Sequence, residues 1–161
     1  MPGDALSDVV VLELATGVAG PYCGKLLADL GAQVIKVEPA GGDPIRNEPP
    51  MVGSDSAFFN WLNGNKLGLE LALDDPRIPE LAAHADIILH SARSEAADAL
   101  DERLRAANPG AVVLSMTPYG RSGSRSEWQA TPLTEWATSG YHYFAGDPAR
   151  EPLALPGFQA E

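Results

Sequence analysis

The residues best suited to receive a ligand are the small ones of residues 16–20, Thr-Gly-Val-Ala-Gly, which follow an apolar run at residues 9–14. Pro21 comes next, and its fixed φ and missing N–H suit the first turn of a helix. Small side chains let a ligand approach backbone N–H groups at a helix N-terminus, where the helix dipole favours an anionic group. The alternative is a tight turn in which small residues serve packing. The spacing differs from Gly-x-Gly-x-x-Gly, so this segment carries no dinucleotide-binding fingerprint.

Two further side chains could take part in chemistry. Cys23 lies near the N-terminus of the predicted helix, a position that can lower the pKa of a thiol. No His or Asp close in sequence completes a nucleophilic pair, so we interpret Cys23 as a core residue. His90 ends the apolar stretch 86–90 and could act as a base, although a lone histidine at a strand end is more often structural. No group of Cys and His has metal-ligand spacing, and we predict no metal site.

The elements that must position these residues alternate between strand and helix. Strands are expected over residues 9–14, 33–38, 67–73, 86–90 and 111–116. In the first helix, Leu26, Leu27 and Leu30 are predicted to form the buried face, and Gly31 is predicted to end the helix. Further helices are expected at 57–62, after Pro76, over 95–107 and from Thr131 to Gly140. This alternation predicts an α/β fold with a Rossmann-like, mainly parallel sheet of about five strands and flanking helices.

The topology places residues 16–20 at a ligand-binding edge of this sheet. Parallel strands joined through a helix require a right-handed crossover, so the loop after the first strand lies at the carboxyl edge. Open α/β sheets bind ligands at that edge.

Composition narrows the function classes. The chain has 161 residues, of which 45% are hydrophobic, and a formal net charge of −11. This charge argues against a general surface for nucleic acid or anionic membranes. The single cysteine, the acidic N-terminus and the lack of a long apolar run predict a cytoplasmic protein with no membrane segment. We expect one region at 1–146 and an irregular tail at 147–161, where the chain stops as if truncated.

An extended set of motifs resembles the N-terminal portion of the family III CoA-transferases, also called the CaiB/BaiF family. The first group comprises Ala19-Gly20-Pro21, residues 27–32, residues 34–39, and residues 42–44 followed by Arg46. The second comprises Asn63-x-Asn65-Lys66, residues 69–71, Ala85-Asp86, Asn108-Pro109 and Tyr119-Gly120. These pieces follow one another in the family's order and with its spacing.

The resemblance implies an acyl-CoA substrate, with no tightly bound cofactor, and a carboxylic acid as the second substrate. It also implies a homodimer, interlocked in full-length relatives. By position, Val18, Ala19, Leu71, Ser91 and Ala92 would contact CoA; Leu71 could equally be an ordinary strand core residue. Arg46 and Lys66 are candidate phosphate partners or simply surface cations. Residues 90–95, His-Ser-Ala-Arg-Ser-Glu, replace the family's usual Glu-Asn-Phe-x-Pro-Gly.

Glu161 occupies the position of the family's nucleophilic aspartate. In the transferases such a carboxylate attacks the acyl thioester, and CoA then returns to form an enzyme–CoA thioester. The alternative is an inert surface glutamate. Three functions follow: a CoA-transferase, a relative of 2-methylacyl-CoA racemase, or a degenerate, non-catalytic CoA-binding half of a fused or partner protein. We expect this chain alone to be inactive.

Overall fold

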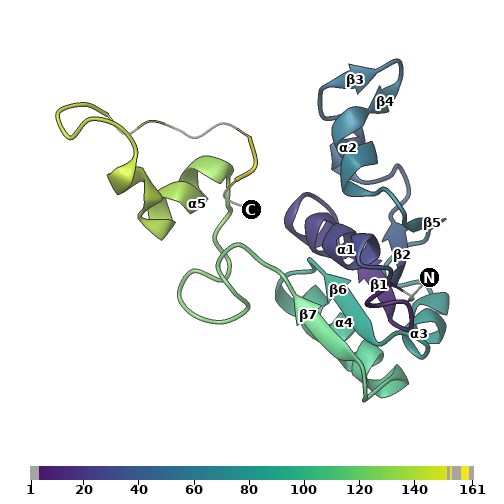
Figure 1. The fold of residues 1–161 in the computed structure, drawn as a ribbon. Coiled ribbons are helices and arrows are strands. Elements are labelled where there is room, and N and C mark those ends of the chain that lie inside the picture. The colour runs from purple at the N-terminus through teal and green to yellow at the C-terminus, as the bar shows by residue number, and fades with distance from the viewer. Residues whose placement is uncertain (1–3, 152, 154–156, 160–161) are drawn as a thin grey trace. The chain divides into compact units, whose positions relative to one another are not determined.

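A computed structural model describes residues 4–151, 153 and 157–159 and divides the chain into two compact units, Met1–Thr117 and Pro118–Glu161. The first unit contains a five-stranded, wholly parallel sheet with the strand order β5-β2-β1-β6-β7 (Figure 1). Its strands are β1 (Val10–Leu14), β2 (Gln33–Glu38), β5 (Leu67–Glu70), β6 (Ile87–His90) and β7 (Val112–Ser115). The predicted fold class is confirmed, and the predicted division at residue 146 stays a prediction.

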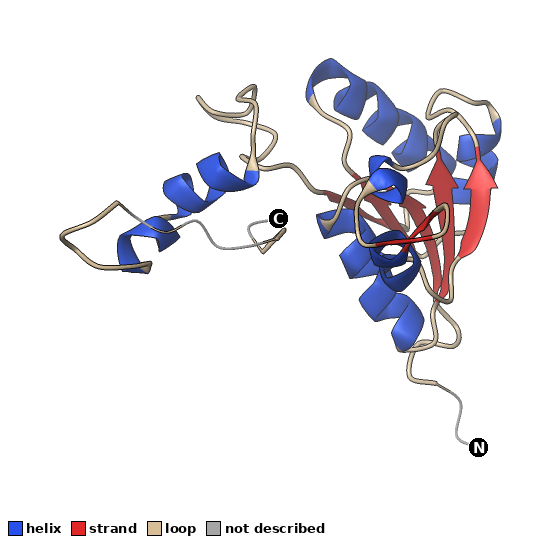
Figure 2. Ribbon diagram, turned by 90° about the horizontal axis from the view of Figure 1, so that it is seen from above, coloured by secondary structure: helices blue, strands red, loops and turns tan. Residues whose placement is uncertain are grey.

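Helices cover both faces of the sheet (Figure 2). The helices of this unit are α1 (Ala19–Asp29), α2 (Ala57–Leu62), α3 (Arg77–Ala82) and α4 (Ser94–Ala107). Leu12 and Leu14 of β1 pack with residues of α3 and α4, whereas Val11 packs with Ala28 of α1 on the opposite face. Because both faces are buried, the central strands read as nearly continuous apolar runs.

The buried face of α1 is not the predicted one. Leu26 and Leu30 are 48% and 51% exposed, and only Leu27 packs against the core. The buried residues are instead Gly20, Pro21, Gly24 and Ala28. A β-carbon at position 20 would lie 2.2 Å from the β-carbon of Ala15, so the helix approaches the sheet too closely for larger side chains. The prediction was wrong because it ranked residues by hydrophobicity, while this contact selects for small size.

Smaller differences concern the ends of elements and one long loop. The strand predicted over 67–73 ends at Glu70, and α1 and α4 begin at Ala19 and Ser94. The loop after β2 contains a 3₁₀ turn, η1 (Pro44–Asn47), and a short antiparallel hairpin of β3 (Met51–Val52) and β4 (Asp55–Ser56). None of these three elements was predicted from the sequence.

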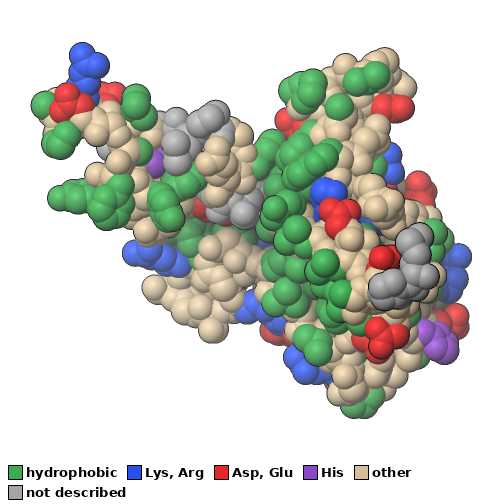
Figure 3. Space-filling view, in the orientation of Figure 1, with side chains coloured by type: hydrophobic (Ala, Val, Ile, Leu, Met, Phe, Trp, Pro, Cys, Tyr) green, Lys and Arg blue, Asp and Glu red, His purple; other side chains and the backbone are tan. Residues whose placement is uncertain are grey.

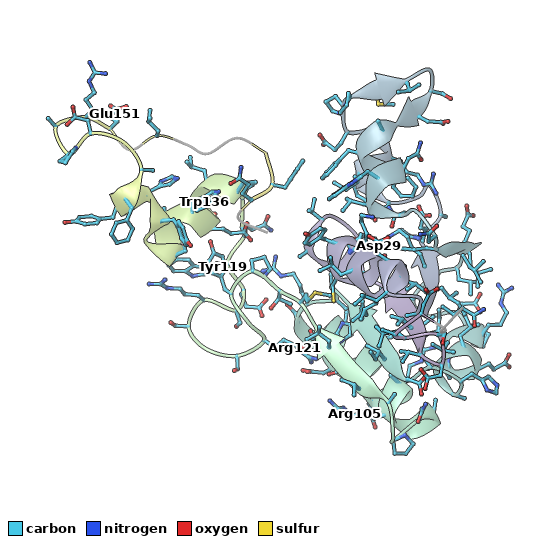
Figure 4. The ribbon with its side chains drawn as sticks, viewed as in Figure 1. Asp29, Arg105, Tyr119, Arg121, Trp136 and Glu151 are labelled. Carbon is cyan, nitrogen blue, oxygen red and sulfur yellow. The ribbon has the colours of Figure 1, made fainter. Side chains whose placement is uncertain are left out.

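The second unit contains α5 (Pro132–Ser139) and a 3₁₀ turn, η2 (Tyr141–Phe144). A capping box between Thr131 and Thr134 begins α5, and Gly140 ends it at φ +81°, as predicted. Trp136, labelled in Figure 4, is buried. Its ring packs edge-on against that of Tyr141. The described residues of 147–161 form only turns and irregular structure. Within the described ranges, no helix is both long and apolar enough to cross a membrane.

Candidate functional site

Two opposite charges lie next to each other on the face of the sheet that α1 covers, toward the carboxyl ends of β1 and β2. Glu13 and Lys36 are register partners, and their side chains are 0% and 2% exposed. Lys36 Nζ donates to Glu13 Oε1 at 3.1 Å, to the carbonyl of Ala15 at 3.1 Å and to Asp43 Oδ2 at 2.9 Å. These three acceptors match the three N–H groups of the ammonium, which compensates for its loss of water.

Lys66 joins this pair from the turn after α2. Its Nζ donates to Glu13 Oε2 at 2.8 Å, to the carbonyl of Pro21 at 2.8 Å and to Asn63 Oδ1 at 2.9 Å. Burial lowers the pKa of Lys66, while the Glu13 carboxylate opposes that shift. Because its three donors point into the protein, we interpret Lys66 as a structural cation rather than a phosphate ligand.

Glu13, Lys36, Asp43 and Lys66 together form what we call the buried charge network, with two positive and two negative groups. α1 lies directly against it at Gly24. A β-carbon at position 24 would come within 1.9 Å of Glu13 Oε2 and 3.3 Å of Lys66 Nζ. The absence of a side chain at position 24 therefore lets the helix close over the network.

The network reaches the candidate CoA-binding loop, residues 16–20, through Asp43. Asp43 Oδ1 accepts hydrogen bonds from the N–H of Gly17 at 3.2 Å and from the N–H of Ile45 at 3.1 Å. On the other side of the loop, the N–H of Thr16 donates to Ser91 Oγ at 3.2 Å. The loop is thus held by the segment after β2 and by the segment after β6.

Val18 and Ala19 lie where this loop turns into α1. Val18 is the N-cap residue and has no side-chain acceptor, so it does not cap the first-turn N–H groups of the helix. Gly17 has φ +84°, a left-handed conformation that glycine adopts without strain. This geometry presents a helix N-terminus of the kind that binds anionic groups. Contact of Val18 and Ala19 with CoA stays a prediction.

The other three predicted CoA contacts lie in different settings. Leu71 is 5% exposed and belongs to the core between the sheet and the pair α3 and α4, a position that fits its alternative interpretation as a core residue. Ser91 is half-buried and accepts the hydrogen bond from Thr16. Ala92 packs partly against the core. Contact of these residues with CoA is likewise untested.

Arg46 lies at the surface beside Asp43 and pairs with Glu38, whose carboxylate also accepts from the N–H of Asp43. Its Nε and Nη2 donate to the two carboxylate oxygens of Glu38 at 2.6 and 2.7 Å, and its guanidinium lies 3.8 Å from the ring centroid of Phe59. The hydrogen bonds from Arg46 hold the pKa of Glu38 below its ordinary value. The Arg46 side chain is about half-exposed, so unlike Lys66 it keeps a face toward solvent.

His90 and Cys23 are unsuited to act on an external substrate. His90 is fully buried, and its Nε2 lies 2.8 Å from Asp101 Oδ1. Cys23 packs against the core around α1, and burial together with the Glu13 charge raises the pKa of its thiol. In the described part of the chain, no group of three or more His, Cys, Asp or Glu residues could hold a metal ion. Glu161 lies outside the described residues.

The buried charge network was not predicted, although the sequence contains a signal for it. An acid inside the run Val-Val-Leu-Glu-Leu and a lysine inside Gln-Val-Ile-Lys-Val-Glu interrupt two strands that are otherwise suited to full burial. Such charges require partners, and neighbouring parallel strands could supply them. Only the register of β1 on β2 shows that Glu13 and Lys36 meet.

Comparisons with known proteins agree with this fold. The model of "CoA-transferase family III" matches residues 6–159. The succinyl-CoA–D-citramalate CoA-transferase of Chloroflexus aurantiacus is 34% identical over 96% of this chain and 40% of its own length. The succinyl-CoA:mesaconate CoA-transferase of Haloarcula hispanica is 39% identical over 72% of this chain and 32% of its own length.

A solved structure gives the same result. A CAIB/BAIF family protein from Brucella suis superposes with a TM-score of 0.84 and 30% identity, over 98% of this chain and 44% of that protein. The chain therefore belongs to the family III CoA-transferases, as its motifs indicated, and spans less than half the length of these relatives.

Proposed function

We propose that this chain supplies the CoA-binding part of an enzyme that moves CoA from succinyl-CoA to another carboxylic acid. The observation that carries the proposal is the 16–20 loop, which leads into the N-terminus of α1 at the carboxyl edge of a parallel sheet. Family membership supports CoA as the ligand of this loop. The names of the two relatives support succinyl-CoA as the donor.

In this proposal, Val18 and Ala19 receive the CoA moiety through backbone N–H groups, with Ser91, Ala92 and Leu71 nearby. Phosphate groups are favoured there because the helix dipole and the uncapped N–H groups both attract negative charge. CoA is a substrate and is released at the end of each turnover.

Glu161 is the proposed nucleophile. Its carboxylate oxygen attacks the thioester carbonyl of succinyl-CoA and the C–S bond breaks. CoA leaves as a thiolate, and a mixed anhydride between Glu161 and succinate remains. The thiolate then attacks the Glu161 carbonyl, which releases succinate and leaves an enzyme–CoA thioester. The acceptor carboxylate attacks that thioester and expels the thiolate, which attacks the acceptor carbonyl and restores the free Glu161 carboxylate.

A homodimer in the cytoplasm completes the proposal. Tyr22, Leu26 and Leu30 recur on one side of α1 at 44–51% exposure, and Trp61 of α2 stacks on Tyr22. Figure 3 shows apolar side chains gathered over α1 and α2. An exposed apolar surface of this kind supports association between subunits.

A second candidate function is a CoA-binding half without catalytic activity. Two departures favour it: Glu161 stands where the family has aspartate, and residues 90–95 lack the family's aromatic and Pro-Gly turn. A racemase has less support, since it needs an acid/base pair and His90 is buried against Asp101.

The test uses Glu161 variants of the full-length protein, because this chain spans less than half the length of its relatives, with succinyl-CoA and a panel of carboxylic acids. Glu161→Gln should reduce CoA transfer by more than roughly 100-fold, because the nucleophile is removed rather than displaced. Glu161→Asp should retain transfer, and hydroxylamine should trap an enzyme-bound acyl group only where a carboxylate is present. Glu151→Gln, on an exposed residue of the same tail (Figure 4), is the matched control.

Each outcome separates the candidates. CoA transfer that persists in Glu161→Gln would show that Glu161 is not the nucleophile. CoA binding without transfer in the unmodified full-length protein supports the non-catalytic alternative.

A further inference from the structure

Asp43 connects the buried charge network to the candidate CoA-binding loop. Its side chain is 0% exposed, and each of its carboxylate oxygens accepts hydrogen bonds from different donors. Oδ2 accepts from Lys36 Nζ at 2.9 Å, and Oδ1 accepts from the N–H groups of Gly17 and Ile45. The backbone N–H of Asp43 in turn donates to Glu38 Oε2 at 2.9 Å, so the residue is fixed through both its main chain and its side chain.

Lys36 determines how this carboxylate is oriented. The ammonium bridges Asp43 and Glu13 and also donates to the carbonyl of Ala15, the residue that precedes the loop. The Lys36 ammonium therefore binds both the start of the loop and the Asp43 carboxylate. A buried carboxylate without an opposite charge is strongly destabilising, and Lys36 supplies that opposite charge to Asp43.

The hydrogen bond to Gly17 lies next to the residues proposed to contact CoA. Gly17 precedes Val18, the N-cap of α1, and its left-handed φ of +84° makes the chain turn into the helix. A loop held in its binding conformation loses less freedom on binding and so has a higher affinity.

We infer that Asp43, oriented by Lys36, is a positioning residue that holds Gly17, and with it Val18 and Ala19, in the conformation that receives the CoA moiety. This inference rests on the proposed CoA-binding function. Asp43 does not itself touch the substrate.

Asp43→Asn, made in the full chain, tests the inference. In either orientation of the amide, its NH₂ group faces a donor: Lys36 Nζ on one side, or the N–H groups of Gly17 and Ile45 on the other. The variant should raise the Kd for CoA and the KM for succinyl-CoA by about tenfold, as expected for one lost hydrogen bond to a charged group. The KM for the acceptor acid should stay unchanged, a selectivity that general destabilisation would not produce.

Asp29→Asn is the matched control. It removes the same charge from the exposed end of α1, where Asp29 pairs only with Lys25 among the described ion pairs. Its Kd for CoA should equal that of the unmodified protein. An equal loss of affinity in both variants would overturn the inference, because net charge would then explain it.

Amide hydrogen exchange without ligand provides a measurement that needs no variant. The Gly17 N–H should exchange more slowly than that of Gly123, which lies in an exposed loop, and Asp43→Asn should accelerate exchange at Gly17. Exchange at Gly17 as fast as at Gly123 in the unmodified protein would overturn the inference even if the variant failed to fold. Accelerated exchange with an unchanged Kd for CoA would overturn it as well.

The failure of the proposed function gives a different result. If the unmodified protein binds no CoA while the Gly17 amide is protected, the hydrogen bond from Gly17 to Asp43 exists but the proposed CoA-binding function is wrong.

Discussion

The two segments that hold the candidate CoA-binding loop are built differently. On the side of β1 and β2, the loop is tied to Asp43, one of four buried charged side chains that pair with one another. On the side of β6, it is tied through one neutral hydroxyl, that of the half-buried Ser91. The first segment carries the family's motifs, and the second departs from them. The two attachments of the loop therefore differ in both charge and burial.

Lys36→Met should have the largest effect on the side of β1 and β2. The variant leaves Glu13 and Asp43 buried without their shared cation, and removing one partner of a buried ion pair destabilises a protein by about 3–5 kcal/mol. Chemical denaturation should show this loss in the free energy of unfolding. Lys25→Met, at a partly exposed i,i+4 pair with Asp29, should change it by less than about 1 kcal/mol. Equal effects in the two variants would show that the network contributes no more than a surface pair.

Gly24→Ala tests how closely α1 packs on the same side. The new β-carbon would lie 1.9 Å from Glu13 Oε2, so either the helix or the carboxylate must move. Overpacking of this kind costs about 1–3 kcal/mol, from which the higher helix propensity of alanine subtracts roughly 1 kcal/mol. Gly68→Ala in β5 is the control, because a β-carbon there meets nothing within 4 Å. A thermal melt in which Gly24→Ala is as stable as Gly68→Ala would contradict the packing described for α1.

The smallest effect is expected on the β6 side. Ser91→Ala removes the acceptor for the Thr16 N–H, a single hydrogen bond worth on the order of 1 kcal/mol. Exchange of the Thr16 amide should accelerate while that of Gly17 stays slow, since Asp43 still holds it. Ser124→Ala, on an exposed loop, should change neither rate. If Gly17 loses its protection in Ser91→Ala, the two segments do not act independently.

Much of the fold could be predicted because it depends on local patterns. Stretches of five to seven residues rich in apolar side chains predicted all five strands of the sheet, and Thr131 and Gly140 predicted both ends of α5. The hairpin of β3 and β4 was missed, since each strand has only two residues and no run long enough to detect.

The interior of the site was harder to predict because it depends on register and distance. Glu13 and Lys36 are separated by 23 positions and meet only through strand pairing. Likewise, Gly20 and Gly24 form the buried face of α1 because the helix lies close to the sheet, a distance that hydrophobicity does not encode. The loop itself was predictable because its small residues, the following proline and the family motifs all occupy one short segment.

A titration of the ¹⁵N-labelled protein with CoA, followed at its backbone amides, tests whether the 16–20 loop receives CoA. We expect saturable changes at Gly17, Val18, Ala19 and Gly20, with slower hydrogen exchange at those amides and no change at Gly68 on the edge strand. Saturable binding that leaves residues 16–20 unchanged, or no binding at millimolar CoA, would contradict this expectation.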